Sequence, residues 1–298
     1  YGVGRSGISL SGGDRTTLTP AGHYALNNDI HDYARLERTY QPAITLDGVG
    51  CRAAHNLIYN APHEAIAFSG NEHIMEFNEI HDVCSETDDA GAIYAGRDWT
   101  MRGNIIRYNF LYRIGGGNNV GVQGVYLDDQ FSGTLVYGNV FYKYPRAMLI
   151  GGGCDNIIQN NLIIDCDQAL SLDARGLGWQ KDASQKGGIL MQRLSQVPYQ
   201  NALWSSQYPA LVHILQDDPG TPKRNVFRNN ILVNSASMNI EAQARQHGSI
   251  GNNWSTNDDP GFQDRERLDF KLRPGAEAFT RVVGFTDIPF EQIGIQDR

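Results

Sequence analysis

The sequence predicts an all-β protein, a right-handed parallel β-helix (a solenoid) with a short helical insertion and an extended C-terminal strap. Three observations support this fold class: an asparagine that recurs along the chain, short strands that align with one another, and one stretch where both patterns fail. A repeat of roughly 20 to 30 residues that contains short strands and no helix of its own is typical of stacked solenoid coils.

The recurring asparagine is followed, two residues later, by an apolar residue. Equivalent residues of successive coils lie about 4.8 Å apart, so they form ladders along the solenoid. We expect each asparagine amide to bond the backbone of its bend and the asparagine of the next coil. The asparagines of this repeat are Asn28, Asn56, Asn78, Asn109, Asn139, Asn161 and Asn230.

Each coil also carries a short strand with alternating apolar residues, and these strands align. Alternate residues of a strand point to opposite faces, so Tyr94 and Tyr126 are expected to face outward, where a long substrate can lie. The last position of the alignment holds small and acidic residues, which leave room and supply carboxylates. The aligned strands are AITLD (43–47), AIAFS (65–69), AIYAG (92–96), GVYLD (124–128), AMLIG (147–151) and ALSLD (169–173).

We predict a single domain, residues 1–298, with coils at about 1–175 and 225–255. Residues 176–224 break the repeat and show apolar residues at helical spacing, which predicts one or two short helices that form one wall of a cleft. Residues 256–298 are punctuated by proline and glycine and are expected to form the strap. Because the repeat begins at the first residues without a capping helix, we expect an N-terminal portion to precede this chain.

Composition excludes several classes of protein. The net charge of −8 argues against binding to nucleic acid, whose phosphates require a basic surface. No apolar run approaches the roughly 18 residues of a membrane span, and no signal peptide is visible. Cys51, Cys84, Cys154 and Cys166 are expected to be buried as small apolar side chains rather than paired in disulfides.

The strongest candidate site combines two acidic pairs on neighbouring coils: Asp88 and Asp89 in TDDAG, and Asp128 and Asp129 in YLDD. We expect these pairs to converge, so that mutual repulsion raises the pKa of at least one carboxyl group while Arg97 keeps another ionised. A protonated and an ionised carboxyl group are what glycoside hydrolysis requires. Strand-end Asp pairs also cap turns or bind calcium, and those alternatives remain open.

Several further residues are candidates for substrate binding. Asp173 and Arg175 either pair with each other or bind sugar hydroxyls, and Trp99 and Trp179 have aromatic faces that can stack on a sugar ring. Asp47 shares the column of Asp128 and Asp173, and His63 lies in a loop one coil below the acidic cluster. No Cys or His cluster has the spacing of a zinc site, and no cofactor is expected unless the Asp pairs bind calcium.

The chain resembles the right-handed β-helix glycoside hydrolases of family 141 and their unclassified relatives. The resemblance covers nearly the whole chain and is strongest in DDAGAIYAGRDWT (88–100) and GVYLDDQFSG (124–133). It implies removal of α-L-fucose from pectin-type glycans or hydrolysis of xylan by two catalytic aspartates. By motif these are Asp89 or Asp88, and Asp129 or Asp128. Members of the family are generally longer, with an N-terminal portion that this sequence lacks.

The first hypothesis is therefore a secreted or periplasmic, monomeric glycoside hydrolase that acts on a polysaccharide. A polysaccharide lyase on the same scaffold is the first alternative. It would need a Lys or Arg base, and Arg97 is the only prominent one near the acidic groove. The second alternative is a non-enzymatic carbohydrate-binding solenoid.

Overall fold

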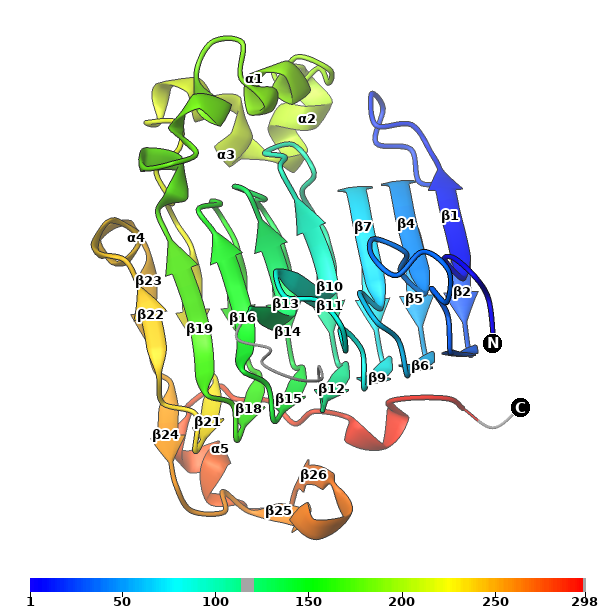
Figure 1. Cartoon of the computed structure of the whole chain (residues 1–298). Helices are drawn as coiled ribbons and strands as arrows, with labels where there is room; N and C mark the ends of the chain where they lie inside the picture. The colour runs from blue at the N-terminus through cyan, green and yellow to red at the C-terminus, as the bar shows by residue number, and fades with distance from the viewer. Residues whose placement is uncertain (114–120, 297–298) are drawn as a thin grey trace.

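Three parallel sheets of eight strands make up most of the molecule, and each coil of the chain contributes one strand to each sheet (Figure 1). The computed structural model describes residues 1–113 and 121–296. The sheets stack in a parallel β-helix-like arrangement. The first sheet contains, in spatial order, β1 (Ile8–Gly12), β4 (Ile44–Val49), β7 (Ile66–Asn71), β10 (Ala90–Gly96), β13 (Val122–Asp128), β16 (Arg146–Gly151), β19 (Gln168–Asp173) and β22 (Met238–Ile240).

The other two sheets consist of three-residue strands. Their shortness leaves a two-residue corner between them in every coil. The second sheet contains β2 (Tyr24–Leu26), β5 (Arg52–Ala54), β8 (Ile74–Glu76), β11 (Ile105–Arg107), β14 (Leu135–Tyr137), β17 (Ile157–Gln159), β20 (Val226–Arg228) and β23 (Ser249–Gly251). The third contains β3 (Asp29–His31), β6 (Leu57–Tyr59), β9 (Glu79–His81), β12 (Phe110–Tyr112), β15 (Val140–Tyr142), β18 (Leu162–Ile164), β21 (Ile231–Val233) and β24 (Trp254–Thr256).

The predicted asparagine ladder occupies this corner and is confirmed. In each rung, the backbone N–H and side-chain amide of one asparagine donate to Oδ1 of the next. Asn109 accepts two such bonds from Asn78, at 3.0 and 2.9 Å, and donates to Asn139 Oδ1 at 2.9 Å. The ladder runs from Asn28 to Asn230 and adds Asn253 at its end.

The strand alignment of the first sheet is also confirmed. Ile44 pairs with Ile66 and Ile93 with Val125, which places the apolar columns in one line inside the molecule. The outward column contains Tyr94 beside Tyr126, and the last column sets Gly96 beside Asp128. The sequence alignment therefore gives the correct neighbours on both faces of this sheet.

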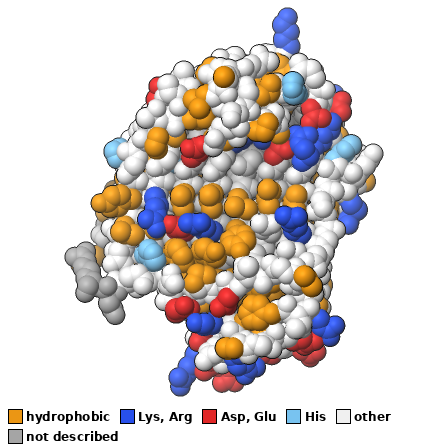
Figure 2. Space-filling model, turned by 180° about the vertical axis from the view of Figure 1, so that it is seen from behind, with side chains coloured by type: hydrophobic (Ala, Val, Ile, Leu, Met, Phe, Trp, Pro, Cys, Tyr) orange, Lys and Arg blue, Asp and Glu red, His pale blue; other side chains and the backbone are white. Residues whose placement is uncertain are grey.

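On the outward face of the second sheet, an aliphatic residue recurs at the first position of several successive strands. Aliphatic residues in register form a partly exposed row across this face, visible from behind in Figure 2. At the end of β8, Glu76 accepts from Arg52 and Arg107 on the two neighbouring strands. This stacking of like residues shows that the coils from β8 to β20 keep the same register on this sheet. The row consists of Ile74, Ile105, Leu135, Ile157 and Val226.

The predicted fold class needs correction. Helix makes up 15% of the chain, and it is not confined to the predicted insertion. The chain is therefore not the all-β right-handed β-helix, with one helical insertion and an extended strap, that the sequence predicted. α4 (Ala242–His247) separates β22 from β23. Its sequence, AQARQH, consists largely of good helix formers. The sequence prediction had placed these residues in a solenoid coil of strands.

The C-terminal segment is likewise not a simple extended strap. It folds into a hairpin and short helices that cover the outward face of the third sheet, along the lower edge of Figure 1. Phe262, Phe270 and Phe285 pack there against residues such as Phe110 and Ile231. The elements are β25 (Phe262–Asp264), η4 (Arg265–Arg267), β26 (Asp269–Leu272), α5 (Glu277–Arg281) and η5 (Phe290–Gln292).

Helices between β19 and β20 lie above the ends of the first-sheet strands (Figure 1). Their apolar side chains, including Leu190, Trp204 and Leu211, form a core of their own with Leu18 and Trp99 from the coil loops. The helices are η1 (Arg175–Leu177), η2 (Lys181–Ser184), α1 (Ile189–Leu194), α2 (Ala202–Gln207), α3 (Pro209–Val212) and η3 (Ile214–Gln216).

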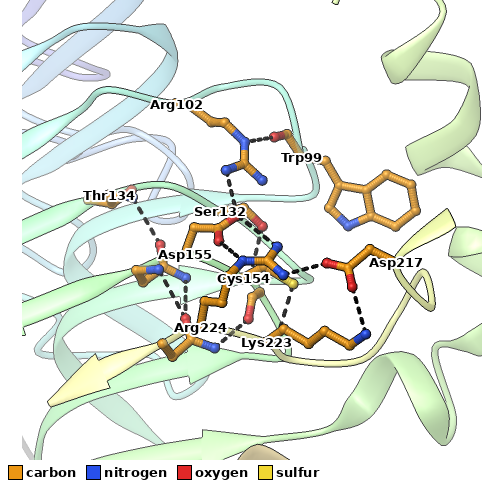
Figure 3. A network of polar contacts seen from close by, with 12 residues as sticks. Trp99, Arg102, Ser132, Thr134, Cys154, Asp155, Asp217, Lys223 and Arg224 are labelled. Atoms are coloured by element: carbon orange, nitrogen blue, oxygen red, sulfur yellow. Dashed lines mark hydrogen bonds and ion pairs between the residues drawn. The ribbon is translucent and has the colours of Figure 1, made fainter. Parts of the chain in front are cut away.

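An ion-pair network holds the end of this helical segment against the coils (Figure 3). Asp155 accepts from Arg102 at 2.6 Å and from Arg224 at 2.5 Å. Asp217 joins Arg224 to Lys223, whose Nζ lies 2.8 Å away. Because Arg102 also donates to the carbonyl of Trp99, one network fixes the loop after β10 and the return of the helical segment.

We expect Asn109→Ala to lower the free energy of unfolding by about 2 to 4 kcal/mol, because it leaves several buried amide groups without partners. Asn28→Ala is the matched control. It removes the end of the ladder, where Asn28 donates to Asn56 and is only half-buried, and should cost about 1 kcal/mol. If urea denaturation showed that both substitutions lower the free energy of unfolding by the same amount, a cooperative ladder would be contradicted.

Candidate functional site

The candidate site lies on the outward face of the first sheet at β10, β13 and the loops that follow them. Tyr94 and Tyr126 are paired in register, and their rings meet edge to face with centroids 5.4 Å apart. The Tyr94 hydroxyl donates to Asp128 at 3.1 Å, and the Tyr126 hydroxyl donates to Asp89 at 3.0 Å. Two carboxyl groups are thus held at either side of one tyrosine pair.

The two Asp pairs are not hydrogen-bonded to each other, and one member of each contacts the tyrosine pair instead. Asp88 and Asp89 precede β10, whereas Asp128 closes β13 and Asp129 follows it. Within the described residues, no hydrogen bond or ion pair joins one pair to the other, and the tyrosines bridge them instead. Asp88 and Asp89 are exposed, while Asp128 and Asp129 are buried.

Glycines at the neighbouring positions make this packing possible. A Cβ at Gly91 would lie 2.6 Å from the Cβ of Tyr126, and one at Gly96 would lie 3.0 Å from the Tyr94 hydroxyl. A side chain at either position would therefore displace a tyrosine. The small residue expected beside Asp128 has a physical reason, because it makes room for the Tyr94–Asp128 hydrogen bond.

Arg175 gathers three carboxylates. It forms ion pairs with Asp128, with Asp129 at 3.1 Å and with Asp173 at 2.7 Å. Asp173 and Arg175, expected either to pair or to bind sugar, are thus paired with each other. The exposed Trp179 ring lies over the Arg175 guanidinium at 5.4 Å and remains available at the surface.

The environments of Asp128 and Asp129 shift their pKa values in opposite directions. Burial raises the pKa of Asp128, and the neighbouring charge of Asp129 raises it further, against the opposing effect of Arg175. Burial also disfavours ionisation of Asp129, but its bonds to Arg97 and Arg175 outweigh burial and lower its pKa. One carboxyl group therefore tends to keep its proton and its neighbour tends to lose it, as general acid–base chemistry requires.

Arg97 lies at the edge of the site with a largely exposed side chain. It pairs with Asp129, and this hydrogen bond and the charge of Asp129 raise the Arg97 pKa. Arg97 therefore acts as the cation that keeps Asp129 ionised, in agreement with the sequence prediction.

Glu64 is a candidate that the sequence analysis missed. It is 2% exposed and precedes β7, next to His63, whose Nδ1 lies 3.6 Å from the Glu64 carboxylate. Burial raises the Glu64 pKa to about 8. Its charge also contributes to the raised pKa of Tyr94, after burial and Asp128, so Glu64 belongs to the same electrostatic environment as the site. The only signal in the sequence was its neighbour His63.

His63 itself is buried and does not line an open groove. Its Nδ1 accepts from the backbone N–H of Tyr40 at 3.3 Å, and its ring packs against the Tyr40 ring. Burial lowers the pKa of His63, and the charge of Asp89 partly opposes this. The predicted substrate-binding role of His63 is therefore replaced by a packing role beside Glu64.

Trp99 does not lie where a sugar-binding role would place it, whereas Asp47 is exposed on the first sheet. Trp99 is 1% exposed, because it belongs to the core under the helical segment. Asp47, within β4, accepts from the hydroxyls of Ser11 and Ser69 at 3.0 and 2.6 Å. Burial opposes ionisation of Asp47, but these hydroxyls lower its pKa.

Within residues 1–113 and 121–296, no group of three or more His, Cys, Asp or Glu side chains is arranged to hold a metal ion. The carboxylates around Arg175 are instead neutralised by arginines. Cys51, Cys84, Cys154 and Cys166 are buried and unpaired, as predicted.

Comparisons with known proteins do not extend this description. No protein-family model matches the chain, and neither a curated protein nor a solved structure matches it. The resemblance to family 141 therefore depends on the sequence motifs alone. Among the described helices, none has the length and apolar character needed to cross a membrane.

The raised pKa of Glu64 predicts a pH-dependent contribution to stability. Its ordinary pKa is 4.5 and its folded value about 8. Between these values the unfolded chain has released the proton that the folded protein keeps, so the contribution of Glu64 is present below pH 4.5 and is lost as the pH rises toward 8.

We therefore expect Glu64→Gln to raise the melting temperature relative to wild type at pH 8 and to have little effect at pH 4.5. Each pKa unit corresponds to about 1.4 kcal/mol, so the difference should reach several kcal/mol. The measurement is thermal unfolding across this pH range. Glu266→Gln, at an exposed position, serves as the control and should show no such trend, and a pH-independent effect of Glu64→Gln would contradict the prediction.

Proposed function

We propose that this chain is a glycoside hydrolase that acts on a polysaccharide lying along the outward face of the first sheet. The observation that carries the proposal is the arrangement of Asp89 and Asp128 at either side of the Tyr94–Tyr126 pair. One of these carboxyl groups is exposed, and the other has a raised pKa. Glycosidases need one protonated and one ionised carboxyl group flanking the scissile bond.

The geometry supports a role for each aspartate. Asp128 is the general acid, because burial and Asp129 favour its protonated form. Asp89 is the nucleophile or the base that activates water, since it is exposed and accepts a hydrogen bond from Tyr126. Asp129 holds Arg97 and Arg175 in place, and those ion pairs make it unsuitable as the acid.

A polysaccharide lyase is less well supported. It would need a base at the sheet face. Arg97 is engaged with Asp129, which raises its pKa, and Arg146 donates to Gln123 and Gln168 and stays charged at neutral pH. Burial, followed by the charge of Asp128, raises the pKa of both Tyr94 and Tyr126, so neither phenol is readily ionised. The carboxyl pair is therefore a better match to hydrolysis than to β-elimination.

The substrate and setting are proposed from the sequence resemblance. Fucosylated pectin-type glycans and xylan are the first substrates to test, and a secreted or periplasmic monomer is the form expected to act on them. The paired arginines and the exposed Trp179 beside Arg175 offer contacts for a sugar ring next to the acids.

Asp128→Asn and Asp89→Asn should each lower turnover about 100-fold to 10,000-fold, the usual contribution of a positioned acid or base. Reducing-sugar release from a panel of fucosylated pectic glycans and xylans is the measurement. In the wild type, activity should decline as the pH rises through the pKa of Asp128, because the acid then loses its proton.

Asp259→Asn is the control for this experiment. Asp259 closes a turn in the C-terminal segment by accepting from the N–H groups of Gly261 and Phe262. Asparagine keeps that acceptor, so turnover should stay at the wild-type level. Wild-type turnover in both Asp128→Asn and Asp89→Asn would reject the mechanism, and an unsaturated product would indicate a lyase.

A further inference from the structure

Arg146 opens β16 and lies on the outward face of the first sheet, half-buried, between two glutamines of neighbouring strands. Its Nε donates to Gln168 Oε1 at 2.6 Å, and its Nη1 donates to Gln123 Oε1 at 3.0 Å. The three side chains are in register, because Gln123 pairs with Arg146 and Arg146 with Gln168. Two neutral amides thus fix the plane of the guanidinium.

No carboxylate within the described residues lies at ion-pair distance from Arg146. This distinguishes it from Arg97 and Arg175 on the same face, which are both paired with aspartates. Its Nη2 has no hydrogen-bond partner among the described side chains and backbone groups. Burial lowers the pKa of Arg146, yet a guanidinium remains charged at neutral pH. A partly buried positive charge is therefore oriented but not neutralised.

The position of Arg146 relates it to the proposed catalytic face. Gln123, which holds Arg146, is on β13, the strand that also carries Tyr126 and Asp128. Arg146 is close enough for the charges of Tyr126 and Asp173 to affect its ionisation. A glycan chain that spans the coils from Asp89 toward Asp173 would therefore pass Arg146.

We propose that Arg146 binds a carboxylate of the substrate, so that the glycan recognised by this face contains uronic acid. The proposal rests on the proposed function for the position of the glycan. Its basis is that a guanidinium forms strong charge-assisted hydrogen bonds with carboxylates, and Nη2 is the nitrogen of Arg146 that neither glutamine binds. A neutral sugar would leave this charge unpaired.

The test measures binding rather than turnover, so a failed hydrolase assay and a failed proposal are separate results. Oligosaccharides of pectate, glucuronoxylan, alginate and hyaluronan are compared with their carboxyl-reduced counterparts by microscale thermophoresis at low ionic strength. The variants are Arg146→Gln and Arg146→Lys. Glutamine at 146 would continue the amide row of Gln123 and Gln168, which favours an intact fold.

Arg228→Gln is the matched control. Arg228 also donates to a glutamine of the neighbouring strand, Gln159 at 3.1 Å, but it lies on the second sheet, away from the proposed site. We expect at least one carboxylated glycan to bind wild type about tenfold more tightly than its reduced form, the scale of one charge-assisted contact.

Arg146→Gln should remove that preference, Arg146→Lys should keep part of it, and Arg228→Gln should keep all of it. The proposal is overturned if no glycan binds better in its carboxylated form, including the case in which none binds at all. It is equally overturned if Arg146→Gln, with wild-type circular dichroism and melting temperature, retains the preference.

Discussion

The amide-to-amide bonding of buried asparagines sets the geometry on which the other elements depend. Each rung fills a two-residue corner between the second and third sheets, and the residue before the asparagine adopts positive φ, as at Phe77 (55°) and Tyr108 (55°). A buried amide without its partner would cost about 1 to 3 kcal/mol, so the corner tolerates neither insertion nor deletion. In the described coils this corner always has two residues, and chain length varies at the other two corners.

This constraint explains where the chain departs from its repeat. The helices before β20 are inserted at the corner between the first and second sheets, and long loops such as 97–104 occur at the same corner. Because the ladder fixes the register on both sides of the insertion, β20 still pairs with β17 although almost seventy residues separate them, as the spacing of Asn161 and Asn230 (69) requires. The helical segment can therefore form its own core around Trp99 without disturbing the stack.

The sequence predicted the surroundings of a side chain correctly wherever that side chain occupies an equivalent position in successive coils. The ladder, the neighbours on the first sheet and the burial of Cys51 and Cys154 all follow from periodicity, because equivalent positions meet equivalent partners. Helix α4 was missed, because a six-residue helix between two strands does not interrupt the spacing of the repeat. The place of Trp99 could not be predicted either, because its burial depends on helices from a distant part of the chain.

In the candidate site, too, some residues could be predicted from the repeat and others depend on long-range packing. The sequence identified the acidic pairs, but their relation depends on two tyrosine side chains whose directions no spacing rule specifies. Glu64 was missed because a single glutamate beside a histidine is not unusual until its burial is known. Such residues acquire their properties from long-range packing, whereas Gly96 could be recognised because its column is aligned by the ladder.

The charge balance on the first sheet decides which carboxyl group can exchange a proton. Arg175 contacts three carboxylates, and Arg97 adds a second cation on one side only, next to Asp129. Asp129 is thus stabilised as an anion, and its charge, together with burial, works against a second anion at Asp128. The asymmetric position of Arg97, the bonds from Arg175 and the burial of Asp128 together shift the pKa values of two adjacent aspartates in opposite directions.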